Sequence, residues 1–153
     1  METTKSSDDG SIPIAALVLS SAGYVPFAGL SVGAMLPSPY QDQASLGLLI
    51  YGAIILSFLG GVHWGLEMAR QSGSAVTGSA TRFGISVVPS LIAWASLALP
   101  QGIAPAGLVV GFSLMLAYDL YCVKQQLAPL WYRNLRLPLT LLVCLAILLP
   151  SAY

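Results

Sequence analysis

Charged side chains are scarce in this chain, and that scarcity excludes most soluble folds. Only 8% of the 153 residues are Asp, Glu, Lys or Arg, whereas about a quarter is usual for soluble proteins. A soluble domain of this length could not cover its surface with so few charges. Since 56% of the residues are apolar, lipid must surround most of the side chains. The formal net charge is zero, which argues against binding to nucleic acid.

Histidine, asparagine and cysteine are also rare. The only asparagine, Asn134, does not belong to a glycosylation sequon. The only histidine, His63, cannot supply both axial ligands of a bis-His haem or a cluster of metal ligands. Cys122 and Cys144 fall in hydrophobic segments, without the spacing of a disulfide framework or a zinc site, and are interpreted as ordinary buried thiols. We therefore expect no cofactor and no metal site.

The first eleven residues form a polar stub. Its charges are mostly acidic, unlike the Arg-rich presequence of an imported organelle protein. The apolar stretch from Ile12 to Leu36 is too long for a signal-peptide core and lacks the basic flank of one. It is interpreted as a retained helix, the first part of a single domain over residues 12–153.

Five stretches approach the roughly 20 apolar residues that a membrane-spanning helix needs. Pro-rich or short polar segments separate them from one another. The expected spans cover residues 12–36, 45–67, 82–99, 105–123 and 135–153. The sequence therefore predicts an all-α fold, a polytopic integral membrane bundle of five transmembrane helices.

The lysines and arginines predict the orientation of the bundle. Cytoplasmic connections carry an excess of these residues. All six lie on one side of the membrane if the chain crosses it five times, with the N-terminus cytoplasmic and the C-terminus outside; they are Lys5, Arg70, Arg82, Lys124, Arg133 and Arg136. Four or six crossings would place some of them on the other side.

The fourth connection, residues 125–136, reads QQLAPLWYRNLR and predicts a short interfacial helix before the fifth span. Trp131 and Tyr132 suit the headgroup level, where Arg133 and Arg136 would face phosphates. We interpret these four residues as a plain interfacial anchor in preference to a lipid-recognition site.

Small residues at four-residue spacing predict where the helices pack closely. The second span carries Ala53, Ser57, Gly61 and Gly65 at this spacing, and His63 lies on the opposite face. Neither face suits lipid, so this helix is expected at the centre of the bundle. The candidate packing positions are Gly29, Gly33, Ser57, Gly60, Gly61, Gly65, Gly107 and Gly111.

Two prolines are expected inside spans. Pro26 lies in the first span and Pro89 in the third. Each should kink its helix and leave a backbone carbonyl without an intrahelical partner.

Ionisable residues inside a span are costly and point to function by default. His63 and Glu67 are four residues apart on one helical face, and Asp119 of the fourth span lies at a similar depth. The functional interpretation is a cytoplasm-facing polar pocket, formed by His63, Trp64, Glu67, Tyr118, Asp119 and Tyr121. The structural interpretation is that His63 hydrogen-bonds a neighbouring helix while the two acids pair with Arg70, Arg82 or Arg136.

Several segments resemble a known family, that of domain-of-unknown-function 3429, which includes transmembrane protein 69 and proteobacterial relatives. The segments are YGAIILSFLGGVHWG (51–65), PSLIAW (89–94), YDL (118–120) and PLWYRNLRLPLT (129–140). The resemblance implies a small multi-helix protein of bacterial inner membranes or of mitochondria, with no activity to carry over. It also implies that some positions belong to the family motif, namely Gly60, Gly61, His63, Trp64, Asp119, Trp131, Tyr132 and Arg133.

Three functions remain open at this point. The first is a non-catalytic subunit, assembly factor or partner-binding module of an inner-membrane complex, which agrees with the absence of any reaction motif. The second is a carrier or channel for a small solute or proton that uses His63 and Asp119. The third is an enzyme acting on a lipid or quinone. The expected partners are the lipid bilayer and either other membrane proteins or further copies of the chain, in a bacterial inner membrane rather than a mitochondrial one.

Overall fold

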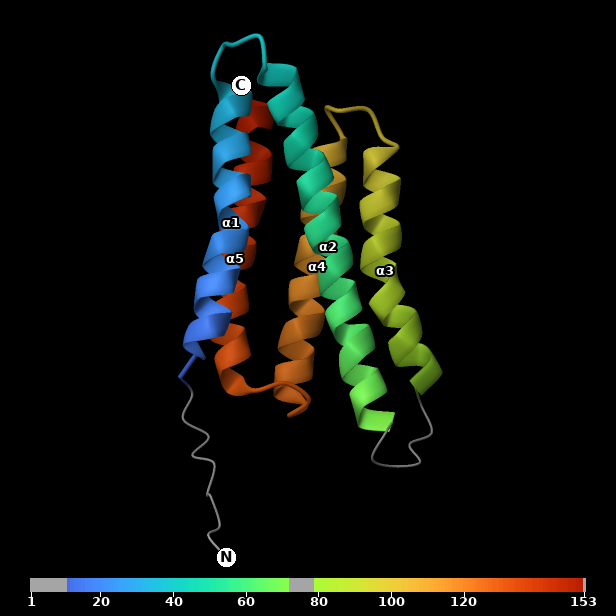
Figure 1. Cartoon of the computed structure of the whole chain (residues 1–153). Helices are drawn as coiled ribbons and strands as arrows, with labels where there is room; N and C mark the ends of the chain where they lie inside the picture. Colours follow the sequence, from blue (N-terminus) through green and yellow to red (C-terminus); the bar gives the residue numbers. More distant parts are fainter. Residues whose placement is uncertain (1–10, 72–78, 153) are drawn as a thin grey trace, which may run out of the picture.

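A computed structural model of the chain describes residues 11–71 and 79–152, which form a bundle of five α-helices that run alternately up and down (Figure 1). Each helix is long and apolar enough to cross a membrane, which confirms the five expected spans. The helices are α1 (Ile14–Met35), α2 (Gln41–Gln71), α3 (Ser79–Leu97), α4 (Ala104–Lys124) and α5 (Leu130–Leu148), and a 3₁₀ turn follows at Leu149–Ala152. The first ten residues of the polar stub and most of the second connection lie outside the described residues.

Helix α2 is longer than its hydrophobic segment predicts. It begins at Gln41 and ends at Gln71, four residues beyond the expected span at each side. The additional turns contain Asp42 near the start and Arg70 near the end, where each charge complements the helix dipole. Hydropathy detects only the apolar part of a helix, so these polar turns were not predicted.

The expected interfacial helix is absent as a separate element from the described part of the chain. Residues 130–136 instead form the first two turns of α5, directly after Pro129. Helix α4 ends in a Schellman motif, in which the Gln126 N–H donates to the Val123 carbonyl and the Leu127 N–H to the Cys122 carbonyl. Gln126 takes the left-handed conformation, with φ of 58°. This tight reversal lets α5 start early enough to bring Arg136 into the bundle.

Helix α2 lies at the centre, in contact with the other four helices. Its close approach to α3 depends on Gly60, where a Cβ atom would collide with the Ser86 carbonyl oxygen. Helix α4 approaches α3 and α2 in the same way, since a Cβ at Gly107 would collide with Ser96 and one at Gly111 with Leu56. Gly33 also packs closely, against Ala44.

The expected contact stripe on α2 is wrong at Gly61 and Gly65. A Cβ atom added to Gly61 or Gly65 would meet nothing within 4 Å, and the same holds for Gly29 of α1. Ser57 is half-buried. The buried face of α2 is instead the one that carries Gly60 and His63. The buried positions of this helix recur every three or four residues along that face.

The centre of the bundle is filled by large apolar side chains from α1, α2, α4 and α5. Phe27 packs edge-on against Tyr51 and Phe112, with ring centroids 4.9 and 6.2 Å apart. Pro26 and Pro89 lie inside α1 and α3 as expected, and Pro138 lies inside α5. Near Pro26, the Tyr51 hydroxyl donates to the Gly23 carbonyl at 2.9 Å, which ties α1 to α2.

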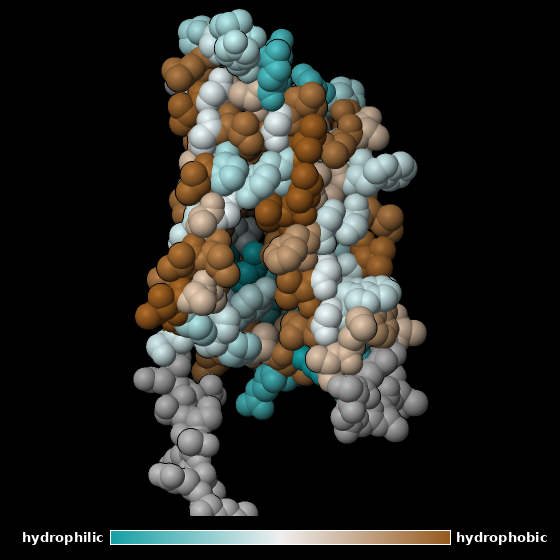
Figure 2. Space-filling model, in the orientation of Figure 1, coloured by the Kyte–Doolittle hydropathy of each residue, from teal (hydrophilic) through white to brown (hydrophobic). Residues whose placement is uncertain are grey.

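The outer surface is apolar over most of its height. Figure 2 shows hydrophobic side chains along the helices and hydrophilic ones gathered toward the two ends, with a hydrophilic recess between two hydrophobic columns. Arg70, Arg82, Lys124 and Arg133 lie at one end of the bundle, where α2 and α4 finish and α3 and α5 begin. We call this the basic end. Lys5 lies outside the described residues, and the cytoplasmic assignment of this end stays a prediction.

Candidate functional site

Three ionisable side chains from three helices form a hydrogen-bonded network inside the bundle. His63 Nε2 of α2 lies 2.7 Å from Asp119 Oδ1 of α4, and Arg136 Nε of α5 donates to Asp119 Oδ2 at 2.7 Å. Only 1% of Asp119 is exposed. Because an ionised carboxylate only accepts hydrogen bonds, His63 carries a proton on Nε2 in this arrangement. We call these residues the His63–Asp119–Arg136 network.

The network lies within a few turns of the basic end. At 1.5 Å per residue, Asp119 is about 7 Å from the end of α4, and Arg136 is about 9 Å from the start of α5. Arg136 is therefore not the interfacial anchor that its position after Trp131 and Tyr132 suggested. The Schellman reversal starts α5 at Leu130, so Arg136 faces α4 and is buried, whereas Arg133 is exposed.

Glu67 belongs to a second cluster, nearer the basic end. Its Oε2 atom lies 3.4 Å from Arg82 Nη1 and 3.8 Å from Arg70 Nη1. Arg70 also donates from Nη2 to the Leu127 carbonyl at 2.7 Å. Glu67 is buried but both arginines are partly exposed, so solvent screens these charges. The cluster joins α2, α3 and the α4–α5 connection.

The expected polar pocket is only partly assembled. His63, Glu67 and Tyr118 line a space of about 10 Å³, together with Arg70, Arg82 and Cys122. The Tyr118 and His63 rings are 4.9 Å apart. Trp64 and Tyr121 are not part of the pocket: Trp64 packs against Phe83 at 4.6 Å, and both residues expose about half of their surface. Trp64 lies about 100° round α2 from His63 and faces the outer surface of the bundle.

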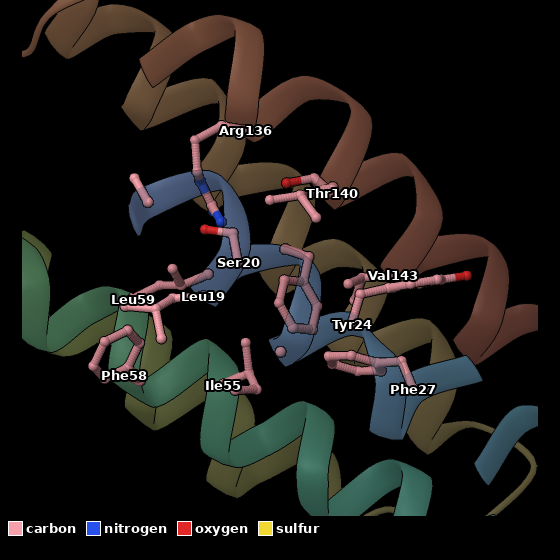
Figure 3. Close-up of a pocket in the computed structure, with 14 residues that line it drawn as sticks. Leu19, Ser20, Tyr24, Phe27, Ile55, Phe58, Leu59, Arg136, Thr140 and Val143 are labelled. Atoms are coloured by element: carbon pink, nitrogen blue, oxygen red, sulfur yellow. The ribbon is translucent and has the colours of Figure 1, made fainter. Parts of the chain in front are cut away.

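A larger cavity of about 370 Å³ adjoins the network on its other side. It lies between α1 and α2 and is closed at the back by α4 and α5 (Figure 3). Most of its lining is apolar, and its polar side chains include Ser20, Arg136 and Thr140. The lining residues are Ala16, Leu19, Ser20, Gly23, Tyr24, Phe27, Ile55, Phe58, Leu59, Phe112, Arg136, Leu139, Thr140 and Val143. Sequence reasoning missed this cavity, because its residues on α1 look like those of any apolar span.

Two buried polar atoms on residues that line the cavity have no hydrogen-bond partner within residues 11–71 and 79–152. They are Nη2 of Arg136 and Oγ1 of Thr140. The two residues are four apart on α5 and so share a face, and Figure 3 shows the nitrogen end of Arg136 pointing toward Ser20 of α1. A buried donor without a partner costs about 1–3 kcal/mol. The arrangement can bind a hydrogen-bond acceptor.

The cavity borders the lipid-facing surface. Leu19 of α1 and Phe58 of α2 belong to its lining, yet 73% and 65% of their surfaces are exposed. Helices α1 and α2 are close at their connection and diverge toward the basic end (Figure 1), and the recess in Figure 2 lies between hydrophobic columns. The cavity therefore reaches the outer surface of the bundle between α1 and α2.

The fold and the buried network define a polytopic membrane protein with a polar network inside its helix bundle. The chain belongs to the family described as "Protein of unknown function (DUF3429)", which it matches over residues 12–152. This confirms the family resemblance of the sequence.

Two animal proteins, both named transmembrane protein 69, are similar to the chain. The one from Xenopus tropicalis is 34% identical over 130 residues, which cover 84% of this chain and 50% of the relative. The one from Mus musculus is 27% identical over 131 residues, which cover 84% of this chain and 52% of the relative. The chain therefore spans about half the length of these relatives. No solved structure matches it.

Proposed function

We propose that the protein is a non-catalytic binding module of a bacterial inner membrane and holds an amphipathic molecule from the bilayer between α1 and α2. The observation that carries the proposal is the pair of unpartnered polar atoms, Arg136 Nη2 and Thr140 Oγ1, at one side of an apolar cavity. A head group that accepts hydrogen bonds would provide a partner for both atoms. An apolar tail would pack against the apolar wall of the cavity.

The shape of the cavity supports a head-and-tail ligand. Arg136 and Thr140 lie toward the basic end of α5, and Val143 continues the lining toward the middle of the bundle. Phe27 and Phe112 line the cavity from α1 and α4. A volume of about 370 Å³ is near the lower end of the range for small-molecule sites, which favours a single chain or ring over a two-chain lipid.

The burial of the network agrees with binding. A general base must come within hydrogen-bond reach of a substrate proton. Asp119 is 1% exposed, and its two oxygens accept hydrogen bonds from His63 and Arg136. The carboxylate therefore orients Arg136, and Arg136 meets the ligand.

We also propose that the protein is a subunit or assembly module of a larger membrane complex. The connections between helices are short, so a protein partner would contact the lipid-facing sides of the bundle. A carrier for solutes receives less support, because the space beside His63 is about 10 Å³, the size of a single water-sized sphere. The concentration of cations at the basic end supports the cytoplasmic assignment of that end.

Binding of simple amphiphiles tests the proposal. The purified protein is placed in phosphatidylcholine nanodiscs and titrated with 1-decanol, 1-decanesulfonate and a decyl-substituted benzoquinone, with calorimetry or native mass spectrometry as the measurement. Saturable binding of at least one probe at one site is expected. Absence of saturable binding for all three would overturn the proposal.

Two glycines of α1 give a matched pair of variants. A Cβ atom at Gly23 or at Gly29 meets nothing within 4 Å, but only Gly23 lines the cavity. Gly23→Phe fills the cavity and should weaken binding at least tenfold. Gly29→Phe places the same ring elsewhere on the helix and should leave binding unchanged. Equal effects of the two variants would place the bound probe outside the cavity.

A further inference from the structure

The charges of the network indicate what kind of head group the cavity favours. Asp119 carries one negative charge and Arg136 one positive charge, and they are hydrogen-bonded to each other at 2.7 Å. With His63 neutral, the network has no net charge. A neutral head group at Arg136 would leave this balance unchanged. An anionic head group would make the stronger, charge-assisted hydrogen bond with the guanidinium, but it would add one buried negative charge.

A buried, uncompensated charge is expensive, so an anion needs a compensating proton. His63 is the group placed to take it. Its Nε2–H already donates to Asp119 Oδ1, and protonation of the other ring nitrogen would turn this hydrogen bond into an ion pair without moving either side chain. The four charges would then sum to zero: the ligand anion, Arg136, Asp119 and His63.

Titratable and charged groups surround His63 from several helices. From α4 it is faced by Asp119, Tyr118 and Cys122. Glu67 and Arg70 of its own helix and Arg82 of α3 line the small space beside it. Glu67 has the two arginines as ion-pair partners, so its charge is already compensated and His63 remains the residue available for the added proton.

We infer that the cavity selects an amphiphile with an anionic head group, such as a fatty acid, and that His63 binds a proton when the anion binds. This inference rests on the proposed function and adds the charge of the ligand and its coupling to pH. The ligand reaches Arg136 from the α1–α2 side. The proton reaches His63 from the basic end, through the small space lined by Glu67 and Tyr118.

The linkage has a definite sign. When an anion and a proton bind together, each increases the affinity for the other by the same factor. The affinity for the anion therefore rises as the pH falls. Where His63 is neutral in the ligand-free protein, the affinity for the anion changes by about tenfold per pH unit for one coupled proton. Where His63 is already protonated without ligand, the affinity no longer changes with pH.

A sulfonate probe separates protonation of the protein from protonation of the ligand, because it stays anionic throughout the neutral range. In the nanodiscs described above, 1-decanesulfonate and 1-decanol are titrated between about pH 6 and 10, a range wide enough to include the titration of a histidine that is hydrogen-bonded to a carboxylate. Tighter binding of the sulfonate than of the alcohol at low pH is expected, with a pH slope for the sulfonate alone. Proton uptake in weakly buffered solution should approach about one proton per bound sulfonate.

His63→Gln is the decisive variant. Glutamine keeps an N–H donor for Asp119 but does not titrate. The variant should bind 1-decanol as the wild type does and bind 1-decanesulfonate with little pH dependence and no proton uptake. If the sulfonate slope persists in the variant, or if wild-type binding takes up no proton, the inference fails. Binding of the alcohol or quinone in the same titrations would leave the proposed function in place.

A further titration distinguishes the two possible sources of the anionic head group, a membrane phospholipid and a free acid. Replacing part of the nanodisc phosphatidylcholine by phosphatidylglycerol supplies the same chemistry as a bilayer phospholipid. Competition with 1-decanesulfonate would indicate a membrane phospholipid as the natural occupant, and its absence would indicate a free single-chain acid. Stronger competition by a cationic amphiphile, decyltrimethylammonium, would contradict the charge assigned to the site.

Discussion

The Asp119 carboxylate accepts a hydrogen bond from Arg136 Nε at 2.7 Å while its other oxygen lies 2.7 Å from His63 Nε2. One acidic residue of α4 thus connects α2 to α5 inside the bundle. Arg136 also lines the α1–α2 cavity, and His63 lines the small space toward the basic end. The network is the physical link between these two spaces, and the proposals above depend on it.

Removal of Asp119 should destabilise the fold more than removal of Arg136. Asp119→Asn leaves the buried Arg136 charge without its partner, which costs about 3–5 kcal/mol for such a break. Arg136→Met leaves Asp119 with His63, so its cost should be smaller. The double variant should be more stable than the sum of the two losses predicts, by about 1–3 kcal/mol. Unfolding of the purified variants by titration with denaturing detergent measures each free energy.

Additive losses would contradict this coupling. Arg133→Met is the control, because Arg133 is exposed near the start of the same helix. Its removal should change the free energy of unfolding by no more than about 0.5 kcal/mol.

Thr140→Val should separate stability from ligand binding. The buried Thr140 hydroxyl has no hydrogen-bond partner in the part of the chain that the structure describes, and valine fills the same volume. Without ligand, the variant should be as stable as the wild type or more stable by about 1 kcal/mol. Binding of 1-decanesulfonate should nevertheless weaken several-fold. A marked loss of stability in the ligand-free variant would show that the hydroxyl has a partner in the folded protein.

Adjacent glycines of α2 should respond differently to alanine. At Gly60 a methyl group collides with the Ser86 carbonyl of α3, so the two helices must separate. Gly60→Ala should therefore lower the free energy of unfolding by about 1–3 kcal/mol. At Gly61 the methyl group meets nothing within 4 Å, and the better helix propensity of alanine should make Gly61→Ala neutral or slightly stabilising. Equal destabilisation by both variants would contradict the α2–α3 packing.

Reporter fusions test the orientation that the cations predict. A fluorescent protein joined to the N-terminus, or inserted between residues 128 and 129, should be bright, since both positions are expected in the cytoplasm. Alkaline phosphatase joined to the C-terminus should be active, because the fifth helix ends on the other side. Alkaline phosphatase that is active when inserted in the α4–α5 connection would show the opposite orientation of the bundle. His63 would then receive its proton from the other side of the membrane.

The span count and family were predictable from the sequence, but the packing faces were only partly so. The glycine pattern on α2 correctly indicated close helix contact, yet it included Gly61 and Gly65 together with Gly60, and of these three the contact is at Gly60. Spacing gives the relative angle of residues on one helix and does not say which angle faces a neighbour. Likewise Trp64 and Tyr121 are neighbours of buried residues in sequence but face outward in the bundle.

The small number of charges by itself determined that this is a membrane protein, because a chain with so few could not be covered by water. The length of its apolar stretches determined the five helices. Only the tertiary structure decided that Arg136 belongs with Asp119, since a one-residue change in where α5 starts would rotate the guanidinium by about 100°. It also decided that α1 and α2 enclose a cavity, because a cavity results from how helices diverge, and no local pattern of residues encodes that.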